Sequence, residues 1–70
     1  MEHKTSAMCQ LLSTLNPGTK VNEIFMQGSS EQVAHFASYD ARTRLATFVQ
    51  QDGDLLVVDA NRIDGVELNT

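Results

Sequence analysis

The arginines are the side chains of this chain best suited to binding chemistry. All three, Arg42, Arg44 and Arg62, lie in the second half of the 70-residue sequence. A guanidinium can form a two-pronged hydrogen bond with a phosphate, or it can stack on a nucleobase. Arg42 and Arg44 are close enough to act as a pair, but they could equally pair with Asp40 or Asp59 and attract nothing. Both interpretations stay open on the sequence alone.

Residue types that usually carry catalysis or metal binding are scarce. Cys9 is the only cysteine, which excludes a disulfide within the chain, and we interpret it as an inert, partly buried thiol. His3 and His35 are too few for a zinc site. Asp52 and Asp54 hint at a calcium loop, but a solvated hairpin turn explains them better. No nucleophile-elbow, phosphate-loop or zinc-protease motif is present, so we expect a protein that is not an enzyme and needs no metal or cofactor.

Size and charge restrict the function further. Nine acidic and five basic residues give a net charge of -4, which disfavours non-specific binding to nucleic acid. The composition is that of one folded domain over residues 1–70, but a core this small is marginal, and oligomerisation is the compensation left. No stretch approaches the roughly 18 apolar residues of a membrane span, and no signal core is visible. We therefore expect a cytoplasmic protein without membrane contact.

One helix and five short strands must position the arginines. Four apolar residues recur on one helical face, and Thr5 or Ser6 can cap the helix, so we predict a helix over about residues 6–15. A turn at Asn16-Pro17-Gly18 follows. Alternating patterns and turn residues then predict five strands, over residues 20–26, 32–39, 44–50, 55–59 and 63–68. This order indicates a mainly β fold, with the helix followed by a strongly bent, antiparallel small barrel over about residues 19–68.

The fourth predicted strand is unusual because it is apolar without interruption from Leu55 to Val58. A strand at a free sheet edge normally shows polar alternation or charges, because its unpaired backbone groups otherwise invite aggregation. We therefore expect both faces of this strand to be buried. Pairing with a strand of another copy of the chain would provide this burial, so we expect a homo-oligomer.

Two stretches carry a specific pattern. The first stretch contains apolar or small residues, namely Val21, Phe25, Gly28, Ala34 and Phe36. The segment Tyr39-Asp40-Ala41-Arg42-Thr43-Arg44-Leu45 follows them. In the second, Val57, Val58 and Asp59-Ala60 precede Ile63 and Val66. Together with the helix and the strand order, this pattern resembles the two motifs of the Sm/Lsm family of ring-forming proteins, to which Hfq also belongs. Arg44 stands where the family has asparagine, and Asp59-Ala60 stands where it has Arg-Gly.

The resemblance implies a single Sm-like domain that assembles into a ring of roughly five to seven copies. In such a ring the fourth strand pairs with the fifth strand of the next copy, and the implied interface residues are Leu55, Leu56, Val57, Val58, Ile63 and Val66. Family members hold uridine-rich single-stranded RNA in loops at the pore. The corresponding RNA-binding residues here are Arg42, Arg44, Asn61 and Arg62, while Tyr39 and Asp40 shape their loop.

The departures from the family pattern keep other functions open. Phage-derived relatives with non-standard pore residues form rings too, and Asp59 would repel phosphates. The alternative is therefore a structural or scaffold ring that holds proteins together without nucleic acid. A third interpretation is a monomer or dimer that binds a peptide along an open sheet edge.

Overall fold

In the computed structural model, which describes residues 7–69, the apolar stripe near the start of the chain forms helix α1 (Ala7–Thr14). Cys9 and Leu12 are buried, and Met8 in the helix and Leu15 just after it pack against the core. The predicted helix is thus confirmed with slightly shorter bounds. The predicted caps, Thr5 and Ser6, lie outside the described residues. No helix within residues 7–69 is long and apolar enough to span a membrane.

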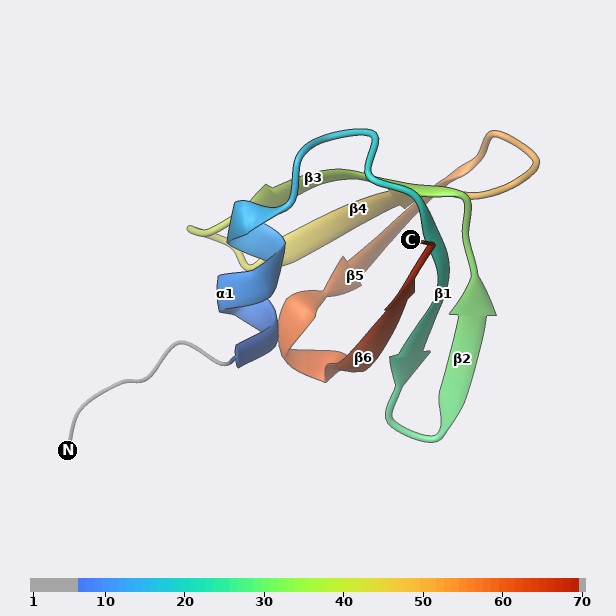
Figure 1. The fold of residues 1–70 in the computed structure, drawn as a ribbon. Coiled ribbons are helices and arrows are strands. Elements are labelled where there is room, and N and C mark those ends of the chain that lie inside the picture. The colour runs from blue at the N-terminus through green and yellow to red at the C-terminus, as the bar shows by residue number, and fades with distance from the viewer. Residues whose placement is uncertain (1–6, 70) are drawn as a thin grey trace, which may run out of the picture.

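Six strands follow the helix and form two antiparallel sheets of three strands each (Figure 1). The order is β2-β1-β6 in one sheet and β3-β4-β5 in the other. The strands are β1 (Val21–Met26), β2 (Ser29–Gln32), β3 (His35–Asp40), β4 (Leu45–Val49), β5 (Leu55–Asp59) and β6 (Ile63–Leu68), and the one-turn helix η1 (Ala60–Arg62) joins the last two. A mainly β fold with an N-terminal helix is therefore confirmed, but the prediction of five strands is wrong by one.

The additional strand is β2, which shares only Gln32 with the strand predicted over residues 32–39 and begins at Ser29, where we expected a turn. The chain bends at Val33 and Ala34 before β3 begins at His35. At the bend the Val33 N–H donates to the Asn22 carbonyl (3.0 Å), and the Ala34 carbonyl accepts from the Val21 N–H (3.2 Å). The Ala34 N–H donates to the Val49 carbonyl in β4 (2.7 Å). The chain thus leaves the first sheet as β2 and enters the second as β3 while remaining bonded to β1.

The bend also changes which side chains face inward. Strict alternation places Val33 and Phe36 on opposite faces, yet both are buried, because residues 33–34 leave the strand geometry between them. A register irregularity between Phe36 and Ser38 shifts the pattern again. Phe36 then meets Phe48 edge to face, with ring centroids 5.8 Å apart. This pair forms the centre of the core.

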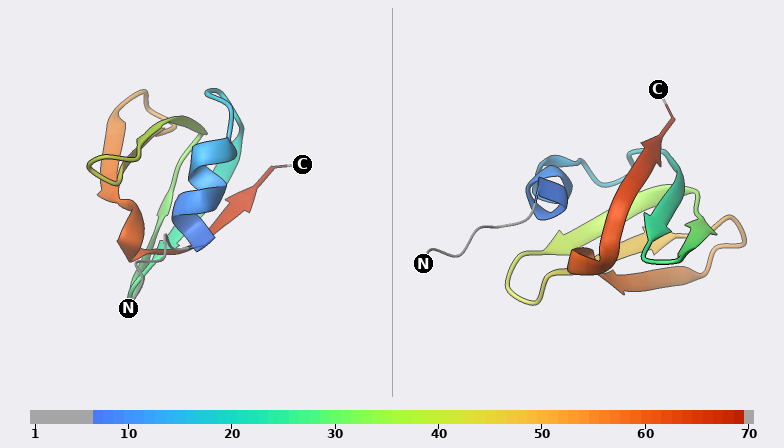
Figure 2. Two further views of the ribbon diagram at one scale, coloured as in Figure 1. Left: turned by 90° about the vertical axis from the view of Figure 1, so that its left-hand side faces the viewer. Right: turned by 90° about the horizontal axis from the view of Figure 1, so that it is seen from below.

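The core lies between the two sheets, and α1 covers one end of it by packing against η1, β3 and β6 (Figure 2). Its buried side chains come from the helix and from both sheets: Cys9, Leu12, Val21, Ile24, Val33, Phe36, Ala46, Phe48, Ala60 and Ile63. Within residues 7–69 no buried side-chain nitrogen or oxygen lacks a hydrogen-bond partner. The core is therefore built from apolar side chains, with no buried polar or charged residue in the described part of the chain.

The sheets do not close into a barrel. β5 and β6 are the outermost strands of their sheets, and each pairs with one neighbour within the described residues. The apolar run in β5 is covered on one face only: Leu55 is 65% exposed and Val57 is 53% exposed. The remaining residues of the predicted interface face inward to different degrees; Leu56, Val58 and Val66 are half-buried, and Ile63 is part of the core.

Candidate functional site

The turn between β3 and β4 lies directly beside η1, at the end of the molecule next to α1 (Figure 1). The Ala60 N–H donates to the carbonyl of Arg44 (2.8 Å), and Leu45 is opposite Asp59 in the pairing of β4 with β5. Two segments that are distant in the sequence are therefore fixed against each other by backbone contacts. This arrangement brings the turn that carries Arg42 and Arg44 next to the segment that carries Asn61.

Backbone hydrogen bonds within the turn set its shape. The Asp40 carboxylate accepts from the Arg42 N–H (2.9 Å), and the Asp40 carbonyl accepts from the Arg44 N–H (2.6 Å). Arg44 closes the turn with φ of 61°, in the left-handed region that asparagine and glycine adopt far more readily than arginine. Asp40 is thus occupied with the backbone, while the side chains of Arg42 and Arg44 are exposed.

Asp59 plays a similar backbone role at the start of η1. Its carboxylate accepts from the Asn61 N–H (2.9 Å) and so caps the short helix. Among residues 7–69, none of the three arginines forms an ion pair with another described residue. The carboxylates of Asp40 and Asp59 therefore lie close to the arginines but leave their guanidinium groups free to contact a ligand.

A chain of side-chain hydrogen bonds fastens α1 to this end of the molecule. The buried thiol of Cys9 donates to the side-chain oxygen of Asn61 (3.7 Å). A hydrogen bond with the same thiol, and then burial, raises the pKa of Tyr39 above its ordinary value. The interpretation of Cys9 as a partly buried thiol did not include this contact, since nothing local links residues 52 positions apart.

Arg62 lies apart from the turn that carries Arg42 and Arg44. It lines a pocket of about 180 Å³ together with Met26, Gln27 and Ser29, which lie in and around the turn between β1 and β2. The pairing of Met26 with Ile63 places that turn next to the end of η1. Of the four residues expected to bind RNA, the structure therefore groups Arg42, Arg44 and Asn61 around one loop contact, and places Arg62 beside another turn.

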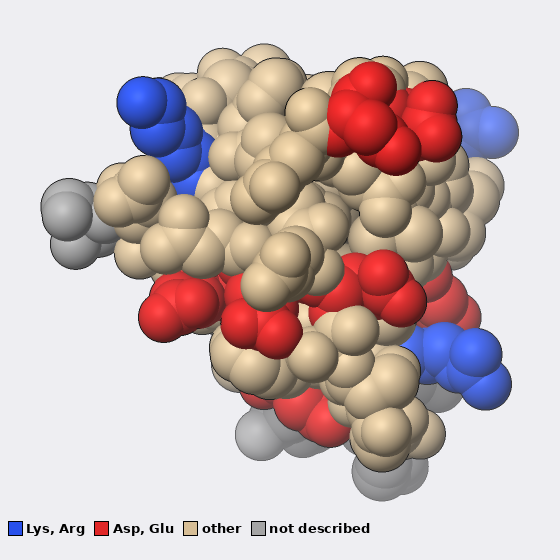
Figure 3. Space-filling view, turned by 90° about the vertical axis from the view of Figure 1, so that its right-hand side faces the viewer, with Lys and Arg blue, Asp and Glu red and all other residues tan. Residues whose placement is uncertain are grey.

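Carboxylates gather on the side of the molecule opposite α1 (Figure 3). Glu23 and Glu67 are opposite each other on neighbouring strands, and Glu31, Asp52 and Asp54 are exposed on the adjoining segments. Asp52 accepts from the Asp54 N–H (3.0 Å), as in a solvated hairpin turn. No group of three potential metal ligands exists within residues 7–69. This acidic side would repel a nucleic acid, so the arginine-bearing end is the one that a polyanion can approach.

Replacing Arg44 with asparagine tests the conformation of the turn. Asparagine tolerates the left-handed region, so Arg44→Asn should raise the free energy of unfolding by up to about 1 kcal/mol in urea titrations. Arg42→Asn makes the same chemical change at a residue without positive φ and should give no such gain. Equal effects of the two substitutions would contradict the assigned conformation.

The Tyr39 hydroxyl can be titrated selectively, because Tyr39 is the only tyrosine in the chain. Its ultraviolet titration should show a pKa above 10. By linkage, the corresponding stability is present below pH 10 and is lost as the pH rises through the raised pKa of the folded state. Cys9→Ala should return the pKa toward its ordinary value, whereas Cys9→Ser, which keeps a hydrogen-bonding group, should not. An unchanged titration in Cys9→Ala would disprove the bond.

The site thus consists of two contacts on different sides of η1: the β3–β4 turn against η1, and η1 against the β1–β2 turn. The first carries two free arginines and the second carries one beside a small pocket. No family model, curated protein or solved structure matches the chain.

Proposed function

We propose that the chain is an Sm-like protein that assembles into a homo-oligomeric ring and binds single-stranded RNA at the end that carries the β3–β4 turn and η1. The observation that carries this proposal is the hydrogen bond between Ala60 and Arg44. It holds side by side the two segments to which the sequence resemblance assigns the RNA-binding loops. Arg42, Arg44, Asn61 and Arg62 are the proposed RNA contacts.

The order of the strands supports the Sm-like assignment. If β2 and β3 are counted as one bent strand, the chain forms a continuous five-stranded series, β6-β1-β2/β3-β4-β5. Its two end strands, β5 and β6, are those that the resemblance assigns to pairing between neighbouring copies. Antiparallel pairing of β5 with β6 of the next copy would cover Leu55 and Val57 and, in a closed ring, leave neither strand with an open edge.

The backbone of Arg44 supports the alignment on which the proposal depends. The resemblance expects asparagine at this position, and the residue adopts a positive φ that asparagine favours. An arginine there keeps the turn but replaces an amide with a cation. We therefore expect the contact with RNA to involve stacking or phosphate binding more than readout of uridine by an amide.

A structural ring that holds proteins together is the second candidate function. The net charge of -4 per chain and the cap formed by Asp59 beside the arginines favour it, because both oppose the approach of a phosphate backbone. In that case the arginines would bind carboxylates of a protein partner. The two candidates predict the same ring and differ in whether RNA binds.

Fluorescence anisotropy with labelled single-stranded RNA at low salt distinguishes the two candidates. Wild-type protein should bind, and Arg42→Ala and Arg44→Gly should each weaken binding across sequences. Each substitution should also lower the slope of the salt dependence by about one unit, because it removes one cation that neutralises a phosphate. Glycine is used at position 44 because it accepts the positive φ without strain.

Lys20→Ala is the matched control, because it removes one positive charge at the opposite end of β3, where Lys20 is bridged to His35. It should leave the affinity nearly unchanged. Equal weakening in all three variants would mean that only net charge matters. No binding of any RNA at low salt would contradict the RNA proposal and leave the structural ring.

A further inference from the structure

The pocket beside Arg62 combines a cation with neutral polar groups and an apolar wall. Arg62, Gln27 and Ser29 are exposed, and Met26 is half-buried. Met26 and Ser29 are opposite each other in the β1–β2 hairpin, and Gly28, with φ of 78°, lets the chain turn tightly between them. The turn thus holds the side chains of Gln27 and Ser29 next to η1, where Arg62 completes the pocket.

The volume of the pocket limits what it can hold. Sites for whole small molecules and cofactors usually measure about 300–1,000 Å³. This pocket has about 180 Å³, enough for one ring system or one small group but not for a complete nucleotide cofactor. It is therefore suited to one chemical group of a larger ligand whose remainder lies outside.

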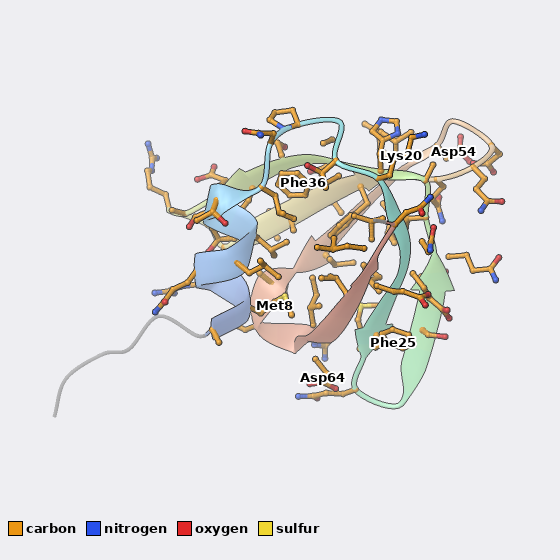
Figure 4. All side chains as sticks on the ribbon, in the orientation of Figure 1. Met8, Lys20, Phe25, Phe36, Asp54 and Asp64 are labelled. Carbon is orange, nitrogen blue, oxygen red and sulfur yellow. The ribbon has the colours of Figure 1, made fainter. Side chains whose placement is uncertain are left out.

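The polar groups favour a nucleobase over a phosphate. A phosphate offers acceptors alone, whereas the lining offers both donors and acceptors: Arg62 is a charged donor, and the Gln27 amide and the Ser29 hydroxyl can each donate and accept. Asp64, which is exposed, follows directly after the partner of Met26 in β6 and lies beside the β1–β2 turn (Figure 4). Its negative charge would repel a phosphate but can accept hydrogen bonds from the amino and imino groups of a base.

We propose that this pocket binds one guanine base of the RNA strand. Guanine presents two acceptors, O6 and N7, on one edge, which is the pattern that an arginine binds with two parallel hydrogen bonds. Its other edge carries N–H donors, for which Gln27 and Ser29 supply acceptors in the lining, while the Asp64 carboxylate lies nearby but outside it. Met26 offers a polarisable surface to the face of the ring. Adenine places an amino donor where guanine has O6, and this donor would meet the guanidinium of Arg62.

The inference rests on the proposed RNA function and deepens it. The Arg42 and Arg44 turn would hold the strand without regard to sequence, and the Arg62 pocket would select a base. Because Arg62 follows Asn61 directly in η1, one continuous strand could pass from the first contact to the second. The sequence preference of the protein would then come from the side of η1 that faces the β1–β2 turn.

Nuclear magnetic resonance of the methionine methyl groups tests the pocket independently of RNA binding. The chain has three methionines, so the Met26 signal can be assigned with one substitution, Met26→Leu. In the full-length protein, GMP should shift the Met26 methyl at a concentration between about fivefold and about 100-fold lower than AMP, the range expected for a good two-pronged contact. The phosphate is the same in both nucleotides, so a difference reports on the base.

Arg62→Lys keeps the charge but cannot form the two-pronged contact, so it should abolish the preference for GMP, whereas Arg42→Lys should keep it. Oligo-adenosine RNA with and without one central guanosine should show the same preference in anisotropy. Equal shifts with GMP and AMP, no shift of Met26 with either, or a stronger shift with UMP would overturn the guanine pocket even if RNA binds. A GMP preference without binding of any RNA would support the pocket and overturn the RNA function instead.

Discussion

The bend at Val33 and Ala34 is the constraint on which the rest of the structure depends. Ala34 accepts a hydrogen bond from β1 and donates one to β4, so a single residue belongs to both sheets. Were the strand straight, the two sheets would be one flat surface and could not enclose Phe36 and Phe48. The bend turns the sheets toward each other, and α1 covers the end that remains open. The bend thus lets a short chain enclose a hydrophobic core, although a core of this size is only marginally stable on its own.

The same geometry has two consequences for function. It places β5 and β6 at the two ends of the strand series, each with one edge that is unpaired within residues 7–69, although β5 carries exposed Leu55 and Val57. It also brings the turn at Arg44 against η1, because β4 and β5 run together up to Asp59. Assembly through the free strand edges would therefore depend on the bend at Val33 and Ala34. Ligand binding at the adjacent loops would depend on the same bend. The acidic side of the molecule, which includes Glu67 of β6, lies opposite α1 and so away from the loop contact beside that helix.

Local patterns in the sequence predict much of this fold. The last two strands have the predicted bounds, because apolar runs and the turn around Gly53 define them clearly. β2 could not be predicted, since its four residues are all polar and exposed and show no apolar alternation. The bend that follows it depends on hydrogen bonds of Val33 and Ala34 to distant strands. Sequence also places the arginines in loops, but it gives neither the positive φ of Arg44 nor the link from Cys9 to Asn61. The first depends on hydrogen bonds within the turn and on the bond from Ala60, and the second depends on the packing of α1 against η1. The separation of Arg62 from Arg44 is of the same kind, because it depends on which turn packs against each side of η1.

The central claim is that β5 and β6 of neighbouring copies pair and close a ring. Native mass spectrometry of the full-length chain, expressed without nuclease treatment, tests it most directly, because the subunit number and any bound nucleic acid are read together. We predict a single closed species of roughly five to seven subunits, carrying additional mass that nuclease removes. The same species without additional mass would keep the ring and favour the structural role. A monomer or dimer would contradict the pairing of the free edges and, with it, the central claim.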